Sequence, residues 1–254
     1  MTRQRTTIMG TQIDRITKPE ALGRIESFLS SGRHHVVTPN AEFILQARRN
    51  KKFQQVLNDA DLAVLDGSGP LIASWFTPIK LKQIIPGSDL AKEVLRMADQ
   101  RHLKVLLLNS ASSLSSTVEI EAAVRRDFPE LEIKVLALTP SEYDSQATRD
   151  EIGEFAPQIL FVGFGSPGQD LWLAENLDRL PSVHLAMGIG GSFDFLSGKR
   201  RRAPRWIRRA GLEWLHRLFS RPRGGKYYFG RRLKKIVRSV VWFPIVFVFT
   251  FNQG

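Results

Sequence analysis

The sequence predicts an α/β fold in which a parallel sheet carries helices on both faces. Short apolar runs typical of buried strands alternate with segments of helical periodicity throughout residues 1–198. Several of these runs end in glycine, as strand-to-helix turns often do. Because 43% of the 254 residues are hydrophobic, the chain can bury a substantial core. We expect about six strands, with a binding site along their carboxyl ends.

Charge divides the chain into two parts. The net charge is +12, yet the segment from Lys199 to Arg238 alone holds 16 Lys and Arg residues and one acid, Glu213. Residues 1–198 contain the other 21 basic and all other 24 acidic residues, so they are mildly acidic. We therefore predict an α/β core over residues 1–198 and a basic C-terminal appendage over residues 199–254.

Composition excludes several classes of protein. The chain has no cysteine, which excludes a disulfide scaffold, thiolate catalysis and cysteine-ligated zinc or iron, and fits a reducing compartment. The first residues, Met1 to Arg5, lead into no apolar run, so we expect no signal peptide.

The first strong strand is expected at His35–Thr38, followed by Pro39-Asn40 and a helix over Ala41–Leu57. Asp59-Ala60-Asp61 then matches the Asp-x-Asp pattern by which many sugar-nucleotide transferases hold a divalent metal. The tripeptide is common, and it lies where the helix is expected to end, so we interpret it as surface acid. Apart from the adjacent His34 and His35 the histidines are dispersed, and we expect no metal site.

The stretch Leu62–Gly69 carries the main candidate for catalysis. An apolar run leads to Asp66, and glycines follow directly. A carboxylate at the carboxyl end of a strand faces the crevice where α/β proteins bind ligands, so Asp66 is our candidate catalytic base. An Asp at a turn also stabilises that turn through its own side chain, and this alternative stays open.

A short apolar helix is expected at Pro70–Phe76. Ile84–Leu90 then leads into a helix through Ala98, which Ser88 or Asp89 can cap. Backbone N–H groups at such a helix start, around Gly87, suit a phosphate, although a capped helix without a ligand explains the pattern equally well.

The middle of the chain adds a strand at Val105–Leu108, a helix at Ser112–Phe128 and a strand at Ile133–Leu138. The serine-rich loop Asn109–Thr117 lacks the glycines of a dinucleotide-binding motif, and no G-x-G-x-x-G follows any early strand. This argues against a nicotinamide or flavin cofactor, and no cofactor is expected.

Two glycine-rich strand ends follow, at Ile159–Gln169 and His184–Phe195. Glycines such as Gly163 and Gly190 allow a backbone to approach a ligand closely, while Gln169 and Asp194 offer hydrogen bonds to a ribose or a base. Tight turning and close helix–strand packing explain the same glycines. Because two such stretches occur in one chain, we favour the ligand interpretation.

The appendage has the pattern of a basic amphipathic helix followed by an apolar segment. Its arginines alternate with Trp and Leu residues, which favours an anionic membrane surface over a helix that is merely solvated and docked on the core. Val240–Phe251 is apolar but too short to span a bilayer, so we interpret it as an interfacial anchor. The arginines expected to contact the membrane or a diphosphate are Arg205, Arg209, Arg217, Arg221 and Arg223.

Taken together, these motifs resemble the bacterial WecG/TagA/CpsF glycosyltransferases. The resemblance extends in order from about Thr38 to Pro222. Its pieces are Thr38–Phe43, Ala60–Gly67, Pro86–Leu90, Gly163–Gln169, Gly188–Gly198, Arg202–Trp206 and Gly211–Leu215.

The resemblance implies a Rossmann-like core and transfer of an N-acetylmannosamine-type sugar, or its uronate, from a UDP donor to a polyprenyl-diphosphate-linked acceptor. It also implies an inverting, metal-independent reaction on the cytoplasmic face of the membrane. Position by position, Asp66 matches the proposed base, Thr38 and Asn40 the adjoining pocket, and Gln169 and Asp194 the donor side. Gly87, Gly163 and Gly190 complete the expected substrate contacts.

This sequence departs from the family pattern in three places. Ile84-Ile85 stands where members often carry a basic residue, with only Lys80 and Lys82 upstream. Ser166–Asp170 reads Ser-Pro-Gly-Gln-Asp in place of Ser-Pro-Lys-Gln-Glu, and the loop after Leu108 is rich in serine in place of glycine. These departures leave the donor sugar open.

Two alternatives remain beside this prediction. A related transferase that uses UDP-glucose or a UDP-uronic acid in exopolysaccharide assembly has the same features. A nucleic-acid- or membrane-binding protein with an inactive site also explains a basic tail, although the adjoining apolar anchor argues against nucleic acid as the partner. Association with further copies of the chain stays open.

Overall fold

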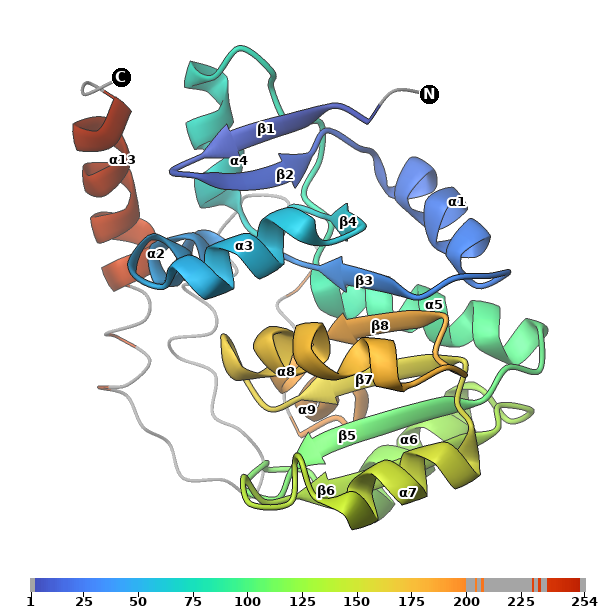
Figure 1. The fold of residues 1–254 in the computed structure, drawn as a ribbon. Helices are drawn as coiled ribbons and strands as arrows, with labels where there is room; N and C mark the ends of the chain where they lie inside the picture. The colour runs from blue at the N-terminus through green and yellow to red at the C-terminus, as the bar shows by residue number, and fades with distance from the viewer. Residues whose placement is uncertain are drawn as a thin grey trace.

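The computed structural model describes residues 3–199 and 237–251, together with Pro204, Ile207, Gly230 and Leu233. Within these residues the chain forms a six-stranded parallel sheet and a separate two-stranded antiparallel hairpin (Figure 1). The strand order in the sheet is β4-β3-β8-β7-β5-β6. The predicted parallel sheet with helices on both faces is confirmed, whereas the division at residue 199 stays a prediction.

The strands are β1 (Arg5–Ile8), β2 (Thr11–Asp14), β3 (His34–Val37), β4 (Leu62–Ala63), β5 (Val105–Ser110), β6 (Ile133–Leu138), β7 (Ile159–Gly163) and β8 (Leu185–Gly188). The α-helices are α1 (Lys18–Phe28), α2 (Ala41–Arg49), α3 (Lys51–Asp59), α4 (Ser68–Ala73), α5 (Gly87–Gln100), α6 (Thr117–Asp127), α7 (Gln146–Phe155), α8 (Gly168–Asn176), α9 (Phe193–Leu196) and α13 (Phe243–Phe251). The other helical turns are η1 (Ser74–Phe76), η2 (Leu177–Arg179), η3 (Gly190–Ser192) and the π-helical η4 (Val237–Trp242).

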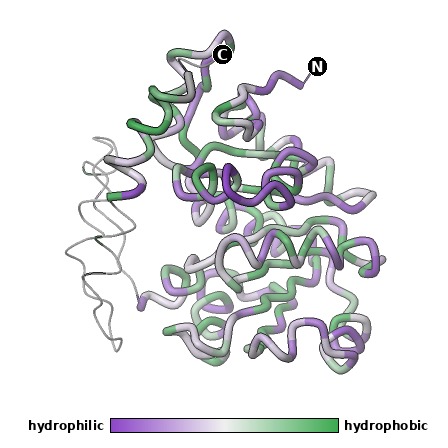
Figure 2. The backbone as a smooth tube through the Cα atoms, turned by 60° about the vertical axis from the view of Figure 1, so that its left-hand side comes forward, coloured by the Kyte–Doolittle hydropathy of each residue, from purple (hydrophilic) through white to green (hydrophobic). Residues whose placement is uncertain are grey.

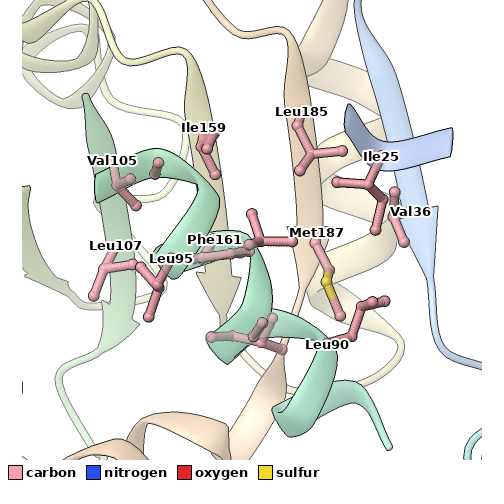
Figure 3. Close-up of a cluster of buried hydrophobic side chains, with 14 of the residues drawn as sticks. Ile25, Val36, Leu90, Leu95, Val105, Leu107, Ile159, Phe161, Leu185 and Met187 are labelled. Atoms are coloured by element: carbon pink, nitrogen blue, oxygen red, sulfur yellow. The ribbon is translucent and has the colours of Figure 1, made fainter. Parts of the chain in front are cut away.

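Alternate side chains of the central strands enter two cores. Val105 and Leu107 of β5 belong to the core that α1, α5 and α6 cover, and Leu106 and Leu108 to the core beneath α7 and α8. Figure 3 shows the first of these cores, where side chains of α5 such as Leu90 lie over the sheet. Strands buried on both faces read as continuous apolar runs, which explains why they were predictable.

The N-terminal hairpin was not predicted. Its two-residue loop, Met9-Gly10, has positive φ at both residues, the geometry of a type I′ turn, but Met is not a usual residue for that turn. The hairpin is tied to the edge of the large sheet, since the Ala63 N–H donates to Asp14 Oδ2 at 2.7 Å. Asp14 is buried and accepts two hydrogen bonds from Arg3, at 2.7 and 2.9 Å.

Three predicted helix boundaries were wrong. The helix expected over Ala41–Leu57 is two helices, because Asn50 leaves helical geometry and its side chain caps α3 by accepting from the Phe53 N–H. Helix α5 begins at Gly87 after Pro86 without a side-chain cap, so Ser88 and Asp89 lie inside its first turn. Helix α6 begins only after Ser116, which forms a capping box with Glu119.

Helix α13 packs against the core. Phe243, Val246 and Phe247 are buried in a cluster with residues of the hairpin, α2 and α4. Figure 1 shows α13 beside α2 and α4, on the side toward which the arrows of β3 and β5 point. Within the part of the chain that the structure describes, no helix has the length and apolar character needed to cross a membrane.

Removing the carboxylate of Asp14 is expected to destabilise the protein by about 3–5 kcal/mol, because Asp14→Ala leaves Arg3 and Arg5 without a buried counter-charge. Asp178→Ala is the matched control, since Asp178 is 92% exposed and its pairing with Arg33 is loose, so a change within about 0.5 kcal/mol is expected. Urea denaturation measures both, and equal small effects would contradict the role given to Asp14.

The ion pair of Glu20 with Lys82 should make the free energy of unfolding depend on pH. A hydrogen bond from Lys82, followed by those from Thr17, lowers the pKa of Glu20 from 4.5 to about 2. A lowered folded-state pKa means that the stabilisation is complete above about pH 4.5 and is lost as the pH falls towards 2. The difference in unfolding free energy between the wild type and Glu20→Gln should therefore shrink across that window in denaturation series. A difference that is independent of pH would refute this assignment.

Candidate active site

The carboxyl ends of neighbouring strands bring the predicted site residues to one edge of the sheet. Strand β3 lies between β4 and β8, and Val36 pairs with Leu62 on one side and with Met187 on the other. The segments that follow these strands carry Asp66, Thr38 and Gly190. Since adjacent strands are about 4.8 Å apart, these three segments fall within about 10 Å laterally.

The backbone fixes Asp66 from two sides. Its N–H donates to the Pro39 carbonyl at 3.0 Å, and the carbonyl of the preceding Leu65 accepts from the Ile85 N–H at 2.7 Å. Asp66 is half-buried. The residue after it, Gly67, has φ +101° and ψ 159°, which non-glycine residues rarely adopt. The turn that follows β4 therefore depends on glycine.

Thr38 lies against the start of α5. A Cβ on Gly87 would lie 3.0 Å from Thr38 Oγ1 and 3.2 Å from its Cγ2, so a larger residue would force Thr38 to move by a few tenths of an ångström. Pro86 precedes α5 and provides no side-chain cap, and the first turn of the helix directs its N–H dipoles to the same edge. The structure thus brings Thr38, Gly87 and Asp66 to the same edge of the sheet, and their roles in catalysis and substrate binding stay predictions.

Asn40 has a structural task. Its Oδ1 accepts from the N–H groups of Glu42 and Phe43, at 3.0 and 3.1 Å, and so caps α2. An Asn directly before a helix is a recognised capping signal, which the sequence interpretation did not use. Contact between Asn40 and a substrate stays a prediction.

Gln169 joins the two glycine-rich loops. Its Oε1 accepts from the Gly190 N–H at 3.0 Å, and the side chain is buried. A Cβ on Gly188 would lie 2.5 Å from Gln169 Nε2 and 2.6 Å from Asp170 Oδ1. Gly188 therefore allows α8 to pack on β8, and Gln169 holds the loop after β8 in place.

Packing also explains Gly163, because a Cβ there would overlap the ring of Phe193. Asp194 lies buried beneath the serine-rich loop, where its Oδ1 accepts from Ser115 Oγ at 2.9 Å and from Ser113 Oγ at 3.4 Å. The close-packing alternative thus accounts for part of what the sequence assigned to ligand binding. Roles for Gly163 and Asp194 in contacting substrate stay predictions.

A buried pair beneath this edge was missed. His35 Nε2 of β3 lies 3.6 Å from Asp170 Oδ1 of α8, and both side chains are buried. Among the described residues, neither carboxylate oxygen of Asp170 has a hydrogen-bond partner. The sequence offered one indication of a role for Asp170, which lies directly after Gln169 in the first turn of α8. An acid at the start of a helix is stabilised by the helix dipole.

The positions that depart from the family pattern have structural partners. Lys82 pairs with Glu20 of α1 at 2.8 Å, Ile85 is buried, and Ile84 packs on the cluster that contains Phe243. The two residues before Pro86 therefore supply no cation. The predicted diphosphate-contacting arginines lie outside the described residues, namely Arg205, Arg209, Arg217, Arg221 and Arg223.

Among the described residues, no three His, Asp or Glu side chains gather closely enough to hold a metal ion. Asp61, part of the Asp-x-Asp pattern, instead supports the start of β3, where its Oδ2 accepts from the His35 N–H at 2.9 Å. His34 Nδ1 lies 3.3 Å from the other oxygen of Asp61.

Comparison with known proteins identifies the family of this chain. The profile described as glycosyl transferase WecG/TagA/CpsF family matches residues 6–243, which include every segment of the candidate site. The chain belongs to this family. It is therefore a glycosyltransferase, and the sequence-based assignment is confirmed.

Two curated relatives carry the same name, N-acetylglucosaminyldiphosphoundecaprenol N-acetyl-beta-D-mannosaminyltransferase. The protein of Bacillus spizizenii is 34% identical over 190 residues, which cover 74% of this chain and 71% of that protein. The protein of Staphylococcus aureus strain MRSA252 is 28% identical over 214 residues, 83% of this chain and 82% of its own length.

Gly67→Ala is expected to destabilise the protein by about 1–3 kcal/mol, because alanine at φ +101° is strained. By displacing Asp66 it should also lower transferase activity by roughly tenfold to a hundredfold. Gly153→Ala is the control: Gly153 lies in α7 with open space around a Cβ, and a gain of about 0.5–1 kcal/mol is expected. Thermal denaturation and turnover measure both, and equal effects would disprove the requirement at Gly67.

Proposed function

We propose that this glycosyltransferase moves N-acetylmannosamine, or a closely related N-acetylhexosamine, from a UDP donor to N-acetylglucosaminyl-diphosphoundecaprenol. The relatives are named for the transfer of this sugar to this acceptor. The observation that carries the proposal is the position of Asp66, whose backbone is fixed beside Thr38 and the start of α5.

Asp66 acts as the general base. An acceptor hydroxyl is a weak nucleophile until its proton is removed, so the carboxylate takes that proton as the oxygen attacks the anomeric carbon. The bond between that carbon and the UDP oxygen breaks in the same displacement, which inverts the anomeric centre. Thr38 lies at the same edge and orients the reacting groups.

The start of α5 and the basic appendage offset the charge that develops on UDP. The N–H dipoles of the first turn of α5 favour an anion at Gly87, and arginines form strong hydrogen bonds to phosphate oxygens. In this proposal Arg205, Arg209, Arg217, Arg221 and Arg223 approach the diphosphate, and no metal is required. Losing one preorganised donor typically slows such a reaction by about a hundredfold.

The loops after β7 and β8 form the donor side. The hydrogen bond from Gly190 to Gln169 fixes one loop against the other before substrate binds, so the substrate need not order them. Gly163, Gly190, Asn40 and Asp194 complete this side of the site.

The enzyme works at the inner face of the cytoplasmic membrane as a peripheral protein. Its proposed acceptor is embedded in lipid, and the appendage combines a high basic charge with an apolar segment. Binding to the bilayer holds the enzyme and the acceptor in the same plane.

The proposal is tested by the release of UDP from a panel of UDP-sugars with a short-chain acceptor, in excess chelator. Asp66→Asn should lower kcat by about a hundredfold to ten-thousandfold, because the variant lacks the base. Asp59→Asn is the control, since Asp59 is an exposed acid at the end of α3.

Turnover with UDP-N-acetylmannosamine that withstands the chelator, collapses in Asp66→Asn and persists in Asp59→Asn supports the mechanism. Turnover that requires a divalent ion and is lost in Asp59→Asn would replace it with a metal-dependent reaction. Preference for UDP-glucose or a UDP-uronic acid would identify a different donor.

A further inference from the structure

Exposed apolar side chains gather on two segments that are far apart in the sequence. One segment is α4 with η1, and the other is the end of η4 with α13. Seven of their large apolar side chains are between 41% and 69% exposed, and we call them the apolar face: Ile72, Trp75, Phe76, Trp242, Ile245, Val248 and Phe249. Figure 2 shows that α13 is hydrophobic along its length although it lies at the edge of the molecule.

The two segments form one surface because they are packed together. The rings of Phe76 and Phe247 are 6.1 Å apart, and a Cβ on Gly69 would lie 3.4 Å from Phe243. Ala73, Phe243 and Phe247 are buried in one cluster between them. The inner sides of α4 and α13 therefore hold each other, and their outer sides point to solvent.

This surface begins beside the candidate base. Helix α4 starts two residues after Asp66, and a Cβ on Gly69 near its start would lie 3.4 Å from the ring of Phe243. At a rise of about 1.5 Å per residue in α4 and about 2.0 Å in the 3-10 helix η1, Ser68–Phe76 extends about 15 Å from the Asp66 turn to the aromatic end of the face. Asp66 and the α4 part of the apolar face thus lie on one continuous segment of the chain.

The chemistry of the face favours a lipid surface over a protein partner. Neither Ser68–Phe76 nor Ser239–Gly254 contains a charged residue. In the sequence, Arg231, Arg232, Lys234 and Lys235 stand directly before the second segment. Apolar and aromatic side chains next to a cluster of basic residues match the acyl boundary and the anionic headgroups of a bilayer.

We propose that the core itself, through α4 and η1, enters the membrane surface together with α13. Trp75, Phe76 and Phe249 lie at the level of the upper acyl chains, and the edge that carries Asp66 faces the headgroups. The inference rests on the proposed function, which places the enzyme at the membrane, and adds that the core makes the second contact and sets the orientation. Because α4 and α13 are packed together, insertion through both gives a broader contact that fixes the orientation of the core.

The absence of cysteine allows a direct test in the full-length chain. Phe76→Cys, Phe249→Cys and Val118→Cys each provide one thiol for a fluorophore that reports polarity. Val118 is the control, since it is 73% exposed on α6 and lies outside the apolar face. The probes are vesicles of phosphatidylcholine with phosphatidylglycerol, and vesicles that carry quenchers in the acyl region.

Labels at Phe76 and Phe249 should shift to the blue on anionic vesicles and be quenched from the acyl region, while the label at Val118 does neither. A response at Phe249 alone overturns the inference and leaves a tail-only anchor, with the proposed function intact. A shift at Phe76 that appears without vesicles as the protein concentration rises also overturns it, because a second copy then covers the face.

A second variant separates this inference from the enzymatic proposal. The double variant Trp75→Ser, Phe76→Ser should bind vesicles at least about tenfold more weakly, because two large apolar side chains no longer enter the lipid. Its turnover should fall on acceptor embedded in vesicles and stay at the wild-type level on a water-soluble acceptor, with Val118→Ser unchanged on both. Equal turnover of the double variant and the wild type on both acceptors overturns the inference, whereas a wild type inactive on both would instead refute the proposed function.

Discussion

The position of the candidate base depends on a strand of only two residues. Strand β4 pairs with β3 on one side, and on the other side the Ala63 N–H is bonded to the buried carboxylate of Asp14. A buried charge is tolerated only when it is compensated, and Arg3, Arg5 and Arg24 surround this one. The N-terminal hairpin thereby supports the strand that leads to Asp66, the candidate base, about fifty residues further along the chain.

The remaining loops of the edge are held by internal hydrogen bonds. Gln169 fixes the loop after β8, and Asp194 fixes the serine-rich loop after β5 to the start of α9. Side chains chosen from the sequence as substrate contacts thus hold other parts of the site in place. These internal hydrogen bonds fix the loops of the candidate site without the help of a ligand.

The sequence predicted the features that short-range patterns determine. Continuous apolar runs identified the buried strands. The acid before two glycines made Asp66 the candidate base, a role that stays a prediction. The sequence did not predict contacts between residues far apart in the chain. Gly163, for example, makes room for the ring of Phe193, which lies thirty positions further along. The hairpin was missed because Met9 is an unusual turn residue, whereas the capping role of Asn40 follows a local rule and was within reach.

The bond between Asp14 and Ala63 also affects how the sheet ends. An edge strand presents unpaired N–H and C=O groups that invite another strand to add, and β4 is the edge strand on this side. Here the Asp14 carboxylate accepts a hydrogen bond from one of those groups, the Ala63 N–H. The hairpin lies against this edge, and its Arg3 donates to the carbonyl of Ala60. Extension of the sheet by a foreign strand is therefore obstructed at this edge, so the cluster that positions the site also protects the folded protein from strand-mediated aggregation.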